Sequence, residues 1–174
     1  MEYTFTLKYQ LADDDRDTDA LVERLGEAGC DDALVGTGQP GRLALEFTRE
    51  ADSADAAVRS ALADVRRAVP SARLIEVAPD LVGLTDVAEI VGVSRQNMRK
   101  LMLAHPGSFP APVHEGSASI WHLADVLAWL QAKGNYSLVK DVFDVARVAL
   151  QVNVAKEGRR LPRSASKELE ALVG

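Results

Sequence analysis

The chain has 174 residues, of which 47% are hydrophobic and 26% charged, and its net charge is −6. This length suits one large or two small domains, and the composition is ordinary for a soluble globular protein. No apolar run reaches the roughly 20 residues of a membrane helix, no secretory leader is evident, and a single cysteine, Cys30, excludes an internal disulfide. We therefore expect a cytoplasmic protein that does not bind a membrane.

The acidic residues are concentrated in the first part of the chain. Residues 1–80 hold 9 Lys/Arg and 17 Asp/Glu, whereas residues 81–133 hold 4 of each and residues 134–174 hold 7 Lys/Arg and 5 Asp/Glu. A polyanion such as DNA is repelled by the first part and tolerated by the other two. If the protein binds DNA, we expect the contact to lie beyond residue 80.

Residues 1–79 are predicted to form an acidic domain in the order strand, helix, strand, strand, helix, strand. Apolar patterning predicts strands at residues 3–9, 31–36, 41–49 and 72–78. Helical spacing predicts two helices, from Asp17 or Thr18 to Ala28 and from Ser53 to about Ala68. This order is that of the ferredoxin-like, split βαβ arrangement, in which two helices cover one face of a four-stranded antiparallel sheet. The topology hosts many functions and does not select one.

The most informative stretch is LTDVAEIVGVSRQNMRKL, at residues 84–101. Ala88 is a small residue at the expected crossing of two helices, and Gly92 can adopt the backbone angles of a tight turn. Thr85 and Ser94 are the expected N-caps of the two helices. This pattern predicts a helix-turn-helix, the motif that places its second helix in the major groove of DNA.

The second helix of this motif presents polar residues outward. We expect the apolar residues Val93, Met98 and Leu101 to pack inward. Arg and Gln suit base edges, whereas Ser94 at the helix N-terminus and Lys100 suit phosphates. Asn97 is expected either to read a base or to cap the helix start with Ser94. Helix-turn-helix patterns also occur in domains that bind proteins, so the motif alone does not establish DNA binding.

The rest of the chain is predicted to be mostly helical. A loop at residues 105–112 leads to a hairpin that turns at Gly116-Ser117, followed by a helix over residues 123–133. The second domain is therefore expected over residues 80–134 and a long C-terminal helix within residues 135–157, from Ser137 to about Lys156. Residues 158–174 are expected to be a flexible tail, with a short helix from Lys167 to Val173.

Residues 82–131 resemble the excisionase and prophage-activator (AlpA-like) family, which is related to MerR-type winged helix-turn-helix domains. The matching segments are LTDVAEIVGVSRQNMRK, FPAPV and IWHLADVLAWL. The resemblance implies DNA binding through Arg95, Gln96, Arg99 and a hairpin wing at residues 114–119. The wing sequence EGSASIWH lacks the arginines often found there, which implies that the wing binds DNA phosphates weakly. The predicted DNA-contacting residues are Ser94, Arg95, Gln96, Asn97, Arg99, Lys100, His114 and Ser117.

The long helix has two adjacent apolar stripes and therefore needs two burial partners. One stripe holds Leu138, Val142, Val145, Ala149 and Val152, and the other holds Val139, Phe143, Ala146, Leu150 and Val154. We expect this helix to form a homodimer, since DNA readers of this kind commonly bind two half-sites. The alternative is that it packs between the two domains of its own chain.

No catalytic or metal-binding pattern emerges from the remaining residues. His105, His114 and His122 have no zinc-ligand spacing, Cys30 has no histidine near it in sequence, and the acidic run at residues 13–19 lacks the glycine and terminal glutamate of a calcium loop. We expect neither an enzyme nor a cofactor. The predicted function is a bacterial DNA-binding transcriptional regulator with an N-terminal regulatory or interaction domain. The alternative is a protein-interaction module, such as an antitoxin or adaptor, that uses the acidic domain.

Overall fold

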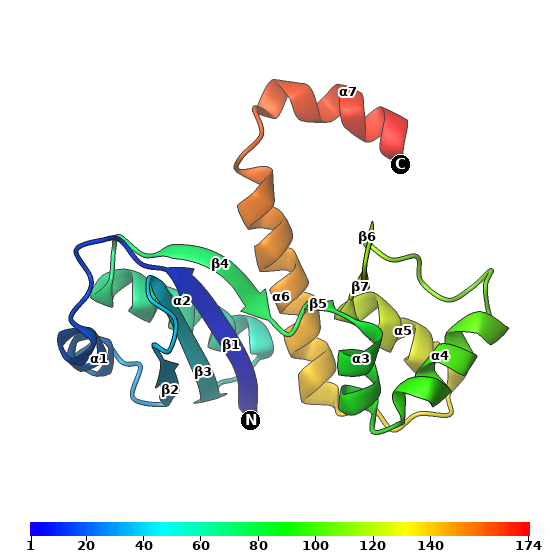
Figure 1. Cartoon of the computed structure of the whole chain (residues 1–174), viewed down its shortest axis with the longest axis horizontal. Helices are drawn as coiled ribbons and strands as arrows, with labels where there is room; N and C mark the ends of the chain where they lie inside the picture. The colour runs from blue at the N-terminus through cyan, green and yellow to red at the C-terminus, as the bar shows by residue number, and fades with distance from the viewer.

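The computed structural model describes the backbone of residues 1–174 and the side chains of all residues except 163–166. It has mixed α+β structure with two antiparallel sheets (Figure 1). The side chains of residues 163–166, within the tail predicted to be flexible, lie outside the described residues. Among the described residues, no helix is both long and apolar enough to cross a membrane.

The N-terminal unit consists of a four-stranded sheet and its helices. Its elements are β1 (Glu2–Gln10), α1 (Thr18–Glu27), β2 (Ala33–Gly36), β3 (Arg42–Glu50), α2 (Ala54–Ala68) and β4 (Arg73–Ala78). The strands lie in the order β2-β3-β1-β4 and all pair antiparallel. Alternation along β1 buries one side of the strand, and Phe5 stacks on Phe47 of β3 with ring centroids 5.3 Å apart. Asp17 and Ser53 accept hydrogen bonds from the first turns of α1 and α2, as expected of N-caps.

The C-terminal unit is smaller and mostly helical. Its elements are β5 (Leu81–Val82), α3 (Leu84–Val91), α4 (Arg95–Ala104), β6 (His114–Glu115), β7 (Ser119–His122) and α5 (Leu123–Lys133). The three short strands lie in the order β5-β7-β6. Residues from every helix of the unit and from β5 and β7 form its hydrophobic core, including Val87, Met98, Trp121 and Leu127.

Helix α6 (Lys140–Gly158) lies between the two units and completes both cores (Figure 1). Val145, Val148 and Ala149 belong to the core of the N-terminal unit, whereas Ala146, with Phe143 and Leu150 beside it, belongs to that of the C-terminal unit. The structure thus shows the alternative arrangement, in which most of both apolar stripes is buried within the chain, while Val139 and Val154 are exposed. The stripes are no longer a reason to expect a symmetry mate on α6.

Three helix starts differ from those expected. Thr85 is not an N-cap: α3 begins at Leu84, and Asp86 Oδ2 accepts a hydrogen bond of 2.9 Å from the backbone N–H of Gly83. An acidic side chain in the first turn therefore replaces the hydroxyl cap. Helix α6 begins at Lys140 rather than Ser137. The last helix, α7 (Arg163–Val173), begins four residues before the expected Lys167 and stands clear of both units in Figure 1.

The side chain of Arg49 is the polar centre of the N-terminal unit. Its Nε and Nη2 donate to the two carboxylate oxygens of Asp32 at 2.7 and 2.8 Å, and its Nη1 donates to Asp64 at 2.8 Å and to Ser60 at 3.0 Å. The carbonyl of Gly29 accepts a further bond of 2.7 Å. All the donors of the guanidinium are therefore used, which is what a buried arginine requires. The hydrogen bonds from Arg49 hold the pKa of Asp32 below its ordinary value.

A second polar group, Asn153 of α6, closes the free edge of the sheet at β4. Its Oδ1 accepts from the backbone N–H of Val77 at 2.9 Å, and its Nδ2 donates to the Val77 carbonyl at 2.8 Å and to Asp80 at 2.8 Å. Lys156, one turn further along α6, donates to the carbonyl of Ile75 on the same edge. Because an edge strand presents unpaired backbone groups, α6 thereby satisfies the edge and blocks pairing with another strand.

Replacing Arg49 by Met should lower the free energy of unfolding by about 3–5 kcal/mol at pH 7, because two carboxylates lose their buried partner. Urea unfolding monitored by circular dichroism measures this change. Arg59→Met is the matched control, since Arg59 makes only an exposed ion pair with Asp55 and should change stability by no more than about 0.5 kcal/mol.

The lowered pKa of Asp32 stabilises the fold above the carboxyl's unfolded pKa, and this stabilisation is lost as the pH falls through the folded value. The difference between Arg49→Met and the wild type should therefore shrink in acid, and equal effects of the two variants would contradict this role.

Replacing Asn153 by Ala should lower the free energy of unfolding by about 1–3 kcal/mol, because buried groups of Val77 and Asp80 lose their partner. The neighbouring Gln151→Ala is the control, since Gln151 is exposed on the same helix. Chemical denaturation of both variants measures the difference. A loss no larger than that of Gln151→Ala would show that water replaces the side chain at this edge.

Candidate nucleic-acid interface

Helices α3 and α4 are joined by a three-residue turn. Gly92 has φ of +78°, in the left-handed region that favours glycine, and the backbone N–H of Val93 donates to the Ala88 carbonyl at 2.9 Å. Ser94 is the N-cap of α4 as expected, since its Oγ accepts from the backbone N–H of Asn97 at 3.1 Å. The turn therefore fixes the direction in which α4 leaves α3.

Met98 anchors α4 to the core, while the opposite side of the helix is open to solvent. Met98 is buried and Val93 and Leu101 are packed against the same core, as predicted. The predicted contact residues of α4, Ser94, Arg95, Gln96, Asn97, Arg99 and Lys100, are all exposed. Asn97 joins the capping bond through its backbone, which leaves its amide side chain at the surface. The structure thus brings six of the predicted residues together on two turns of one helix.

We define the reading face as Arg95, Gln96, Arg99, Lys100 and Leu103. Residues at this spacing share one side of a helix, and the three cations make no ion pair among the described side chains. Leu103 was not among the predicted residues, although 59% of its surface is exposed. Its position three residues after Lys100 and seven after Gln96 is the signal that would have identified it. An exposed leucine can contact the methyl group of thymine.

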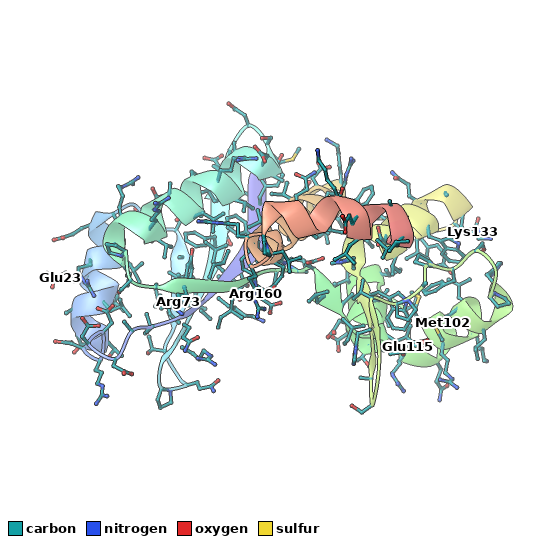
Figure 2. All side chains as sticks on the ribbon, turned by 90° about the horizontal axis from the view of Figure 1, so that it is seen from above. Glu23, Arg73, Met102, Glu115, Lys133 and Arg160 are labelled. Atoms are coloured by element: carbon teal, nitrogen blue, oxygen red, sulfur yellow. The ribbon has the colours of Figure 1, made fainter. Side chains whose placement is uncertain are left out.

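The β6–β7 hairpin carries the other predicted residues, His114 and Ser117, which are both exposed. In Figure 2 the tip of the hairpin, labelled at Glu115, and α4, labelled at Met102, lie along the same edge of the C-terminal unit. The ring of His114 lies over the turn, because a Cβ added at Gly116 would be 2.6 Å from His114 Nε2. The hairpin tip therefore presents a carboxylate and a folded-back imidazole, and in Figure 1 it points away from α4, which lies lower in the C-terminal unit.

Aromatic side chains hold the loop between α4 and the hairpin. The indole N–H of Trp121 donates to the Pro110 carbonyl at 3.0 Å, and Phe109 meets the rings of Trp121 and Trp129 edge-on, with centroids 6.1 and 5.1 Å apart. Trp121 is buried in the core of the C-terminal unit, whereas Trp129 is partly exposed. Because the loop is tied at several points, the hairpin has a defined position relative to α4.

The remaining candidate residues are not gathered into a reactive site. Burial raises the pKa of the Cys30 thiol to about 11, with a smaller contribution from the carboxylate of Asp64. A thiol of this kind is a poor nucleophile at neutral pH. Among the residues whose side chains are described, no group of three histidine, cysteine or acidic side chains is placed to hold a metal ion.

Comparison with protein-family models, with curated proteins and with solved structures finds no match to this chain. The resemblance of residues 82–131 to the excisionase and prophage-activator family therefore stays an expectation that depends on the residues themselves.

Replacing Gly92 by Ala should lower the free energy of unfolding by about 1–2 kcal/mol, because a Cβ is strained at positive φ. A Cβ at this position would meet nothing within 4 Å, so the cost comes from the backbone and not from a clash. Gly107→Ala is the control, since Gly107 lies in a loop, also has open space, and has no positive φ. Thermal unfolding of the two variants measures the difference, and similar midpoints would contradict the strain at Gly92.

Proposed function

We propose that this protein is a transcriptional regulator that reads duplex DNA with α4. In this proposal α3, the turn and α4 are a helix-turn-helix, the β6–β7 hairpin is its wing, and the N-terminal unit is a ferredoxin-like domain. The observation that carries the proposal is the reading face. There Gln96 and three cations, which make no ion pair among the described side chains, cover two exposed turns of a helix whose other side is anchored by Met98. The protein acts by binding and not by catalysis.

The dimensions and the chemistry of α4 support this proposal. Ten residues of helix extend roughly 15 Å, and the major groove of DNA admits one α-helix. Arg95, Arg99 and Gln96 have donors that suit the edges of guanine and adenine, and Lys100 suits a phosphate. Ser94 and the first N–H groups of α4 suit another phosphate. The wing contributes less in this proposal, because Glu115 repels the DNA backbone.

The distribution of charge is consistent with this assignment. The acidic N-terminal unit and α4 lie at opposite ends of the molecule in Figure 1. With residues 1–80 carrying 17 Asp/Glu against 9 Lys/Arg, DNA bound along α4 is kept away from the repulsive part. We propose that the N-terminal unit serves regulation or assembly. Because it lies far from α4, it remains free to contact other molecules while α4 binds DNA.

We propose that the protein binds DNA as a homodimer, although α6 does not provide the surface. Only three cations lie on the reading face, so one copy neutralises few phosphates and binds weakly. Helix α7 presents Leu169, Leu172 and Val173 to solvent, at the i, i+3, i+4 spacing of one helical side. In this proposal the exposed apolar side of α7 forms the homodimer interface.

A protein-interaction module is the second candidate function, and the same exposed side of α7 favours it. A helix of 11 residues is marginal in water without a partner. Analytical ultracentrifugation distinguishes self-association through α7 from binding of another protein. In the second candidate, DNA binding is absent and the protein acts as an adaptor or antitoxin.

Replacing Arg95 and Arg99 together by Ala should weaken DNA binding by about 1–3 kcal/mol for each arginine that contacts a base. The target duplex is first selected from a random pool with the wild-type protein, and affinities are then measured by fluorescence anisotropy at several salt concentrations. The matched control is Arg59→Ala with Arg66→Ala, which removes the same charge from exposed positions of α2. Unchanged affinity after the α4 substitutions, or an equal loss in the control, would refute the assignment of α4 as the reading helix.

A further inference from the structure

A pocket of about 620 Å³ lies where the two units and α6 meet, and we call it the junction pocket. The segment that links β4 to β5, the end of β7, the last turns of α6 and the turn after α6 contribute its walls: Asp80, Leu81, His122, Asn153, Val154, Glu157, Gly158, Arg160 and Leu161. Its volume lies within the roughly 300–1,000 Å³ of small-molecule sites in proteins.

The polar floor of the junction pocket is an ordered set of three side chains. Asp80 is fully buried, its Oδ1 lies 2.6 Å from His122 Nδ1, and its Oδ2 accepts from Asn153 Nδ2 at 2.8 Å. Asn153 is in turn held by the backbone of Val77. Each carboxylate oxygen of Asp80 thus has a partner, and the contact with Asp80 fixes the orientation of the imidazole ring of His122.

The second ring nitrogen of His122 is the polar atom that this arrangement leaves for a ligand. His122 Nε2 has no hydrogen-bond partner among the described side chains and backbone. No described buried side-chain nitrogen or oxygen lacks a partner, so Nε2 is accessible to solvent. The ring is 20% exposed and lines the pocket. In the protonated ring both nitrogens donate, so Nε2 then offers a hydrogen bond to an acceptor.

The walls of the pocket are aliphatic, and the charged residues that line it besides Asp80 are Glu157 and Arg160. Leu81, Val154 and Leu161 are all exposed by about half of their surface, which is unusual for residues grouped around one hollow. On the rim, Glu157 lies 2.9 Å from Lys156 and 3.0 Å from Arg160, so two cations face one carboxylate. The hydrogen bonds from Lys156 and then Arg160 hold the pKa of Glu157 below its ordinary value.

We propose that the junction pocket binds a small carboxylate with an apolar body. The carboxylate accepts from His122 Nε2 and lies within reach of Arg160, while the body covers Leu81, Val154 and Leu161. A charge-assisted hydrogen bond to a fixed donor selects an anion over a neutral molecule of the same shape. The site is separate from α4, so its existence does not depend on whether the protein binds DNA.

The test uses the full-length protein and the probe 4-phenylbutyrate, with the neutral 4-phenylbutyramide as its matched control. The ring signals of the three histidines, His105, His114 and His122, are followed by NMR, and affinities are measured by calorimetry. We expect saturable shifts confined to His122 and an affinity for the carboxylate about tenfold higher than for the amide.

Two substitutions separate the pocket from the rest of the surface. Leu161→Glu removes an apolar wall and adds a repulsive charge, and should weaken binding of 4-phenylbutyrate about tenfold. Leu34→Glu, at an exposed leucine of β2, is the control and should leave the affinity unchanged. Both leucines are exposed by more than half of their surface, so we expect both variants to fold. The proposal is overturned if His122 does not shift at millimolar probe, if the amide binds equally well, or if Leu161→Glu binds like Leu34→Glu. Because no DNA is present, these outcomes are independent of the DNA-binding assays.

Discussion

The two units of this protein are held together by one buried polar junction, in which Asp80 accepts hydrogen bonds from His122 and Asn153. Asp80 belongs to the linker, His122 to the end of the hairpin and Asn153 to α6, so three distant parts of the chain meet at one carboxylate. Its backbone carbonyl also accepts from the N–H of Leu123 at the start of α5. A buried carboxylate is costly unless its oxygens are satisfied. The relative positions of the linker, the hairpin and α6 are therefore tightly constrained.

This constraint connects the sheet of the N-terminal unit to the proposed reading helix. Asn153 and Lys156 bind the backbone of β4, while the other side of α6 supplies Ala146, Phe143 and Leu150 to the core that anchors α4 through Met98. The path from the acidic sheet to α4 is thus a continuous set of packed side chains and hydrogen bonds. Helix α6 acts as a shared wall, and neither unit has a complete core without it.

Local patterns predicted the elements well, whereas the sequence contains no local signal for the contacts that assemble them. The alternation in β1, the N-caps at Asp17, Ser53 and Ser94, and the turn at Gly92 each depend on neighbouring residues, and all are present. The cap of α3 was misassigned to Thr85, because Asp86 and Thr85 are both capable of satisfying a helix start.

Hydrophobic periodicity along the sequence could not predict the contacts between residues that lie far apart in the chain. Asn153 lies 76 residues from Val77, and His122 lies 42 residues from Asp80. The apolar stripes of α6 showed that it needs two burial partners but not which ones. For the candidate site, the polar residues of α4 were identified from the sequence, whereas the exposed Leu103 was not among the predicted residues.

The position of α6 near the end of the chain has a consequence for biosynthesis. During translation, residues 1–133 leave the ribosome before the helix that closes both of their cores, and the edge of β4 stays unpaired until Asn153 and Lys156 emerge. An unpaired edge and an open apolar surface are the features that promote aggregation of nascent chains. The two units therefore mature together once α6 has emerged, and a cut at the linker would not release two independent modules.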